Sequence, residues 1–141
     1  MNAAQQVQRY VDGVLDGSII AGQLQKAAVR RYVSDLKRAA KPSCSFVFNQ
    51  NAAEVALEFF PLLAHSSAEF AGQSFQLEPD QMFIIWNLIG WRRKADGKRR
   101  FKYAHIEAAR KWGKTCFAAA IILLLFFLDE KRYFKSMREY L

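Results

Sequence analysis

The stretch that most constrains this chain covers residues 107–115, with the sequence E-A-A-R-K-W-G-K-T. It is preceded by the β-prone segment 101–106 (F-K-Y-A-H-I) and followed by the uncharged apolar run 116–128 (C-F-A-A-A-I-I-L-L-L-F-F-L). Phosphate-binding P-loops have this order of a strand, a loop ending in Gly-Lys-Thr and a buried helix. The backbone N–H groups of such a loop and the positive end of its helix surround phosphate oxygens. The stretch therefore predicts nucleotide binding.

Three residues of this loop have expected roles. Lys114 is expected to reach the β- and γ-phosphates, and the Thr115 hydroxyl to help hold Mg²⁺. Gly113 allows the backbone to approach phosphate closely. The standard pattern has its first glycine at the position of Ala108, and Gly-Lys-Thr also occurs by chance in basic loops beside helices. From this stretch alone, the chance match stays open.

Composition indicates a folded chain with an anionic partner. The 141 residues are 52% apolar and 14% aromatic, which excludes general disorder. The net charge of +8 favours nucleic acid, nucleotide or an acidic protein surface as partner. Cys44 and Cys116 have neither metal-ligand spacing nor a disulfide framework, so we expect a reduced, intracellular setting. The polar start predicts no signal peptide, and the run 116–128 is shorter than the about 20 residues of a membrane span.

Hydrophobic periodicity predicts helices along much of the chain. The first begins near residue 5 and breaks at Gly17-Ser18, and the second covers about 23–39. A short extended piece is expected at 46–49, a helix at 51–63, and a mostly buried helix at 80–88 after Pro79. The residues expected on apolar helix faces are Val7, Tyr10, Val11, Val14, Leu15, Leu24, Ala27, Ala28, Tyr32, Leu36, Ala52, Val55, Ala56, Phe59 and Phe60.

The segment 92–102 (R-R-K-A-D-G-K-R-R-F-K) is strongly basic. Asp96-Gly97 at its centre is typical of a two-residue turn, so the segment predicts a basic hairpin or tight loop. Its cations either contact DNA phosphates or are simply solvated, and composition does not decide between the two. The candidate nucleic-acid residues are Arg92, Arg93, Lys94, Lys98, Arg99 and Arg100.

Four stretches together resemble the large terminase subunit of tailed bacteriophages, a family of ATP-driven DNA-packaging motors with a nuclease domain behind the ATPase domain. They are Y-V-D-G-V-L-D-G-S-I-I-A-G with R-R-Y-V-S-D-L, E-F-A-G-Q-S-F-Q-L-E-P-D-Q-M-F-I-I, G-W-R-R-K-A-D-G-K-R-R-F-K, and I-E-A-A-R-K-W-G-K-T, in the family's order. The resemblance covers roughly residues 10–128. It implies an α/β fold in which a helical N-terminal region (1–65) precedes the first part of a P-loop (ASCE-type) ATPase region (66–141), with an incomplete sheet.

The resemblance also implies roles for individual residues. The family's L-x-P-x-Q element recognises adenine, which implies that Gln81 faces the base, although a glutamine at a helix start also serves the backbone alone. The family's phosphate loop often lacks the first glycine and carries basic residues, so Ala108, Arg110 and Lys111 fit it. Trp112 departs from the small or polar residue usual there and is a candidate to crowd the phosphate site.

The implied cofactors are ATP and Mg²⁺, the latter on Thr115, and the implied partners are double-stranded DNA, the small terminase subunit and the portal, in the bacterial cytoplasm. The acidic Mg²⁺-binding strand, the catalytic glutamate and the nuclease carboxylates of the family follow later in its sequence. We therefore expect a truncated chain that binds ATP and contains no catalytic residue, so that enzyme activity stays open. The alternatives are a basic helical module that binds DNA or protein, and a non-functional prophage remnant.

An incomplete sheet has a further consequence for apolar side chains. Parallel strands need neighbours on both sides and helices on both faces. Trp86, Trp91, Phe126 and Phe127 are therefore expected to lack part of their usual cover, which favours self-association. His65 and His105 are expected to be structural or exposed, because neither has a carboxylate or cysteine neighbour at useful spacing.

Overall fold

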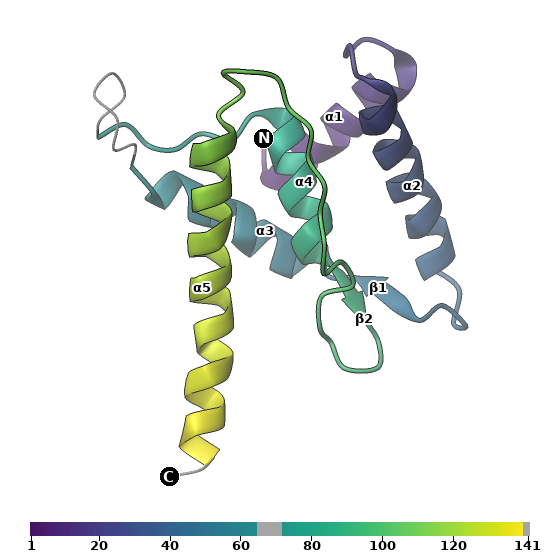
Figure 1. Cartoon of the computed structure of the whole chain (residues 1–141). Helices are drawn as coiled ribbons and strands as arrows, with labels where there is room; N and C mark the ends of the chain where they lie inside the picture. The colour runs from purple at the N-terminus through teal and green to yellow at the C-terminus, as the bar shows by residue number, and fades with distance from the viewer. Residues whose placement is uncertain (65–71, 140–141) are drawn as a thin grey trace. The chain divides into compact units, whose positions relative to one another are not determined.

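The computed structural model describes residues 1–64 and 72–139, with backbone only for 129–139, and has a mixed α/β, mostly helical fold. The elements are α1 (Ala3–Asp16), α2 (Gln23–Ala39), β1 (Phe46–Phe48), α3 (Gln50–Phe59), the 3₁₀ helix η1 (Phe60–Leu62), α4 (Pro79–Gly90), β2 (Trp91–Arg93) and α5 (Lys114–Glu139) (Figure 1). Two compact units share the chain. The first consists of Met1–Glu58 and Gln76–Ala104, and the second of Phe59–Phe75 and His105–Leu141.

The first unit is built on α1, which packs against both α2 and α4. A capping box begins α1: the Asn2 side chain accepts a hydrogen bond from the Gln5 backbone at 2.9 Å, and the Gln5 side chain accepts one from Asn2 at 3.0 Å. The helix ends at Gly17, whose φ of +84° is the left-handed conformation that glycine adopts without strain. The predicted break at Gly17 and the predicted helix over 23–39 are both confirmed.

A two-stranded antiparallel sheet joins α2 to α4 in this unit. Phe46 pairs with Arg93 and Phe48 with Trp91 in the register of β1 and β2. Because α4 ends at Gly90 and β2 begins at the next residue, helix and strand are continuous. A Cβ atom at Gly90 would lie 2.3 Å from the Phe48 ring, so the close approach of β1 requires glycine there.

The predicted basic hairpin is confirmed. The Arg93 N–H donates to the Lys98 carbonyl at 2.9 Å, and the Gly97 N–H donates to the Arg93 carbonyl at 2.8 Å. Gly97 has a φ of +66°, which the turn requires. Beyond the turn, the Arg100 N–H donates to the Trp91 carbonyl at 2.9 Å, so β2 has β1 on one side and the returning segment on the other.

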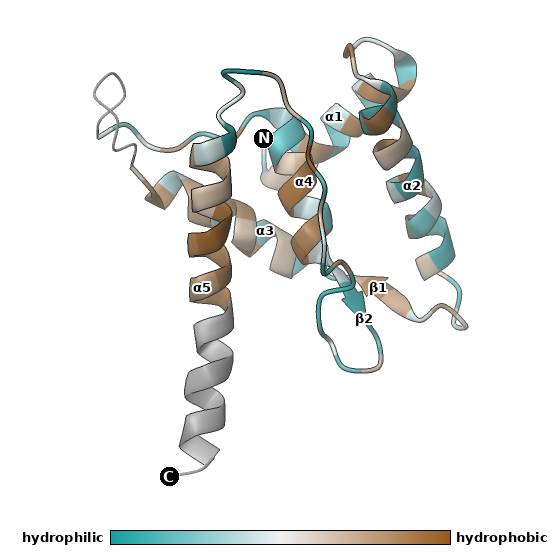
Figure 2. Ribbon diagram, in the orientation of Figure 1, coloured by the Kyte–Doolittle hydropathy of each residue, from teal (hydrophilic) through white to brown (hydrophobic). Residues whose placement is uncertain are grey.

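Aromatic rings form the core of the first unit. Trp86 and Trp91 are 3% and 0% exposed, so the expectation that they lack cover is wrong. The rings of Tyr32 and Phe48 cover these indoles, with ring centroids 5.0–6.2 Å apart in the pairs that they form. The two tryptophans are therefore buried without a larger sheet. The Trp86 Nε1–H also donates to the Tyr32 hydroxyl at 3.0 Å, which satisfies a buried polar group. In Figure 2 hydrophobic colours run along α4, and they also cover much of the coloured part of α5 in the second unit.

In the second unit, α5 begins at Lys114 and continues to Glu139, beyond the apolar run 116–128. Within that run only Phe117, Ala120 and Leu124 are buried, so the expectation of a buried helix is wrong for most of its residues. The predicted strand over 101–106 is wrong, because this segment has no regular secondary structure. A strand needs a partner for its N–H and C=O groups, and among the described residues the two named strands pair with each other. Phe126 and Phe127 are 57% and 52% exposed, which confirms the expectation for this pair.

Candidate functional site

The loop before α5 has an unusual backbone. The Trp112 N–H donates to the Ala109 carbonyl at 3.4 Å, which closes a turn over residues 109–112. Lys111 has a φ of +64° and Gly113 a φ of +85°, and Lys111 is the single non-glycine residue with positive φ in the described part of the chain. Left-handed residues in a loop are one element of the backbone concavities that bind anions.

The helix start continues this arrangement. The Phe117 N–H donates to the Gly113 carbonyl at 2.9 Å as the first hydrogen bond of α5. The N–H groups of the helix positions before Phe117 have no intrahelical acceptor, and the helix dipole places partial positive charge there. The helix start, directly after the loop, therefore offers an anion a set of backbone N–H donors.

The side chains of the loop are accessible. Lys114, Thr115, Arg110 and Lys111 are all exposed. The Lys114 Nζ donates to the Ala108 carbonyl at 3.1 Å. The ammonium group therefore lies against the loop that precedes Lys114. The structure thus brings together in one unit all the residues that the sequence predicts for phosphate binding, which are Ala108, Arg110, Lys111, Gly113, Lys114 and Thr115.

Trp112 packs against the helix that follows it. Its ring is half-buried and meets the Phe117 ring edge-on, with centroids 5.3 Å apart and planes at 88°. Phe117 itself is only 2% exposed, so it forms a firm base for this contact.

Gln81 lies in the first unit, apart in sequence and in unit from the loop. Its side chain completes a capping box at the start of α4, where Oε1 accepts a hydrogen bond from the Glu78 N–H at 3.1 Å. It is 5% exposed. The backbone role that the sequence left open is present, and the adenine-recognition role stays a prediction.

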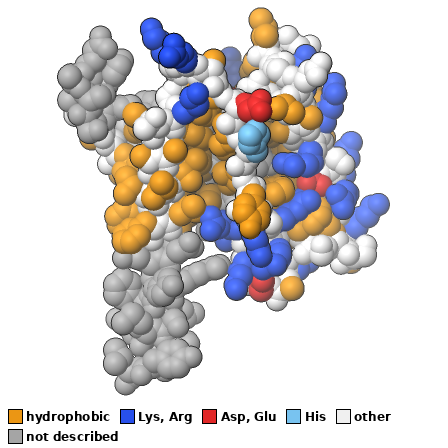
Figure 3. Space-filling view, viewed as in Figure 1, with side chains coloured by type: hydrophobic (Ala, Val, Ile, Leu, Met, Phe, Trp, Pro, Cys, Tyr) orange, Lys and Arg blue, Asp and Glu red, His pale blue; other side chains and the backbone are white. Residues whose placement is uncertain are grey.

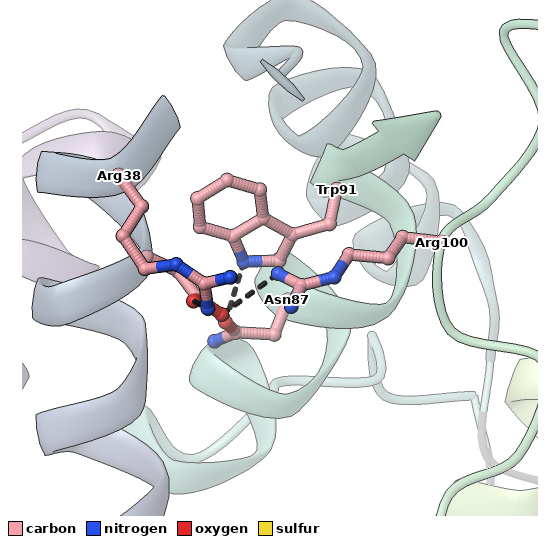
Figure 4. A network of polar contacts seen from close by, with 5 residues as sticks. Arg38, Asn87, Trp91 and Arg100 are labelled. Atoms are coloured by element: carbon pink, nitrogen blue, oxygen red, sulfur yellow. Dashed lines mark hydrogen bonds and ion pairs between the residues drawn. The ribbon is translucent and has the colours of Figure 1, made fainter. Parts of the chain in front are cut away.

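Arg100 differs from the other hairpin cations because it points inward. Its guanidinium donates to Asp35 Oδ2 at 2.7 Å, and Arg38 donates to Asp35 Oδ1 at 3.1 Å (Figure 4). The same guanidinium lies 3.6 Å from the centroid of the Phe46 ring. Beside it, the Trp91 Nε1–H donates to Asn87 at 3.1 Å. Arg100 therefore joins the hairpin to α2, a role that the sequence interpretation missed.

A signal for this network was present in the sequence. Asp35 follows Tyr32 by three residues and so lies on the buried face of α2, where it is 2% exposed. A carboxylate on a buried helix face needs a cationic or hydrogen-bonding partner. The strongly basic segment 92–102 was the evident source of that partner.

The remaining hairpin cations lie at the surface or in local contacts. Arg93 forms an ion pair with Asp96, whose pKa is held below its usual value mainly by the hydrogen bond from the Lys98 N–H. Lys94 and Lys98 are exposed, while Arg92 and Arg99 are half-buried and face each other in an isolated antiparallel bridge.

The hairpin and α2 together form one basic face. Arg31 of α2 stacks over the Phe101 ring at 4.9 Å, and Arg100 stacks over the same ring at 4.9 Å. In Figure 3, lysine and arginine side chains gather over α2 and the hairpin. We call this the basic face; its exposed members are Arg30, Arg31, Lys37, Arg38, Lys94 and Lys98.

Other candidate chemistry is limited. His105 Nε2 lies 3.0 Å from Glu107 Oε1, so this histidine does have a carboxylate neighbour, contrary to the sequence interpretation. Both side chains are exposed, at 81% and 71%, and His65 lies outside the described residues. Over residues 1–64 and 72–128 no three His, Cys, Asp or Glu side chains gather as a metal site. None of the described helices is long and apolar enough to span a membrane.

Comparisons with known proteins give no relative. No model of a known protein family matches the chain, and neither the curated proteins nor the solved structures contain a significant match.

Proposed function

We propose that this chain binds Mg²⁺-ATP through the loop 107–115 and forms the nucleotide-binding part of a terminase-type DNA-packaging motor. The observation that carries the proposal is the backbone of Lys111 and Gly113, both left-handed, directly before a helix that begins at Lys114. Left-handed residues directly before a helix start favour an arrangement of N–H groups around an anion. The terminase part of the proposal rests on the resemblance of the four sequence stretches.

The side chains fit the same ligand. The Lys114 ammonium already lies over the loop, and it would exchange the Ala108 carbonyl for phosphate oxygens. Exposed Arg110 and Lys111 add positive charge beside it. Thr115 offers its hydroxyl to the Mg²⁺ ion, which would neutralise charge on the phosphates. Hydrolysis is not part of the proposal.

The test is Mg²⁺-ATP binding by the chain and by Lys114→Ala, measured by calorimetry. A lost charge-assisted phosphate contact costs about 1.5–3 kcal/mol, so affinity is expected to fall roughly ten- to a hundredfold. Lys98→Ala is the matched control, since it removes the same charge from an exposed site in the first unit. Binding that is equally tight in Lys114→Ala, or absent from a folded chain, refutes the proposal.

A second candidate function is supported by the basic face. Its cations come from two segments about sixty residues apart, held together by the contacts of Asp35 and Phe101. Exposed cations gathered over one helix and a neighbouring hairpin suit the phosphate backbone of duplex DNA.

This second candidate is tested by the salt dependence of binding to a short duplex, followed by fluorescence anisotropy. Lys94→Ala/Lys98→Ala is expected to reduce the slope of log K against log salt by about 2, because each cation that contacts a phosphate contributes about 0.9. Lys114→Ala, in the second unit, is the control. An unchanged slope in the hairpin variant would rule out these contacts.

A further inference from the structure

The conformation of Lys111 needs an explanation. A lysine with a φ of +64° has its Cβ atom close to its own backbone, and such residues persist only where neighbouring contacts hold them. The turn hydrogen bond from Trp112 to Ala109 is long, at 3.4 Å, and the Lys114–Ala108 bond is exposed to water. These two bonds alone are a weak hold on an unfavourable backbone.

The stronger hold is the aromatic contact of the next residue. Trp112 lies between the two left-handed residues, and its ring packs edge-on against Phe117 at 5.3 Å. The backbone N–H of the same Phe117 binds the Gly113 carbonyl at 2.9 Å. The loop is therefore attached to one buried helix residue at two successive positions, once through a side chain and once through the backbone.

We propose that Trp112 is a positioning residue that holds the loop in its anion-binding conformation before the ligand arrives. This inference rests on the proposed function of the loop and adds the reason why a large ring stands where a small residue would suffice. The ring packs on the helix through Phe117, so it contributes to the geometry of the loop.

Pre-organisation of this kind has a defined signature. Without the ring, the loop populates other backbone conformations, and the observed affinity falls by the fraction of chains that remain competent. An edge-to-face ring pair contributes enough to make this loss about two- to tenfold. Because the loop binds phosphates, the loss is expected to be the same for pyrophosphate as for ATP.

The experiment compares Trp112→Ser with Trp112→Phe, in which the shorter ring keeps an aromatic contact with Phe117. Without ligand, brief trypsin treatment reports the loop through cleavage after the exposed residues Arg110 and Lys111. Faster cleavage is expected in Trp112→Ser and a rate near that of the original chain in Trp112→Phe. With ligand, pyrophosphate affinity is expected to fall two- to tenfold in the serine variant and to be rescued by phenylalanine.

The outcomes separate the two proposals. Equal cleavage rates in all three chains overturn the positioning role of Trp112, whether or not nucleotide binds. A serine variant whose α-helical circular dichroism melts at a lower temperature in proportion to its faster cleavage would also overturn it, since Trp112 then supports packing in general. Failure of the original chain to bind pyrophosphate and ATP refutes the proposed function, and the cleavage comparison still decides the role of Trp112.

Discussion

The network around Asp35 allows a quantitative prediction about what holds the hairpin. Asp35 has two cationic partners with very different surroundings: the Arg100 side chain is 22% exposed, and the Arg38 side chain is 60% exposed. Water and salt screen the outer pair and leave the inner one largely intact. The two ion pairs on one carboxylate are therefore expected to contribute unequally to stability.

The expected magnitudes follow from this difference in exposure. A charge-assisted hydrogen bond at 2.7 Å in a mostly buried setting has a coupling energy of about 1.5–3 kcal/mol, which we assign to Asp35 and Arg100. An exposed pair spaced three residues apart on a helix gives about 0.2–1 kcal/mol, which we assign to Asp35 and Arg38. The contact of the Arg100 guanidinium with Phe46 is lost on Arg100→Gln whether residue 35 is Asp or Asn. Its contribution therefore cancels from the coupling energy between Asp35 and Arg100.

The assay is a pair of double-mutant cycles, Asp35→Asn with Arg100→Gln and Asp35→Asn with Arg38→Gln, followed by urea unfolding. All variants carry Trp112→Phe, so that the tryptophan fluorescence comes from Trp86 and Trp91 in the first unit alone. A coupling energy for Arg38 equal to or larger than that for Arg100 would show that burial does not rank these pairs and would refute the reasoning.

Two further predictions concern the loop 107–115 and the core. Gly113→Ala is expected to cost about 1–2 kcal/mol of loop stability and five- to thirtyfold in Mg²⁺-ATP affinity, because the added Cβ meets no atom within 4 Å and only the φ of +85° is strained. Gly22→Ala, at a φ of −68°, is the control and is expected to bind normally. Burial raises the pKa of Tyr32 above its usual 10.0, and the hydrogen bond from Trp86 lowers this pKa by a smaller amount. The unfolded chain then loses the phenol proton first, so stability is expected to be intact below about pH 10 and to fall as pH rises through the folded pKa. Urea midpoints at about pH 9 and about pH 10.5 should differ less in Tyr32→Phe, and an equal difference would contradict this assignment.

The sequence predicted the local elements well where periodicity and turn chemistry agreed. The bounds of α2 and the basic hairpin are confirmed because each depends on a few nearby residues. The hairpin loop covers residues 94–97, however, and is longer than the predicted two-residue turn at Asp96-Gly97. The buried face of α2 also differs from the face that the sequence predicted. Leu24 and Leu36 were expected inside and are 68% and 37% exposed, because the pattern of apolar residues did not count Asp35 as a buried position.

Long-range contacts account for the rest. The segment 101–106 has strand propensity, but whether a strand forms depends on a neighbour elsewhere in the chain. Similarly, the contact of Arg100 with Asp35 joins residues 65 positions apart, and no local pattern specifies it. For the candidate site, the sequence pointed to the loop 107–115, while the left-handed Lys111 and the packing of Trp112 on Phe117 became evident only in three dimensions.

The direct passage of α4 into β2 at Gly90 bears on where this chain accepts extra residues. An insertion between Gly90 and Trp91 would rotate the strand relative to the helix, and the hydrogen bond from Asn49 to the Gly90 carbonyl, 2.7 Å long, would be lost. The opposite end of the same hairpin is an exposed four-residue loop, residues 94–97, in which Asp96 and Gly97 have local hydrogen-bond partners. A peptide tag or a labelling loop therefore belongs between Asp96 and Gly97, six residues from a junction that tolerates no change in length.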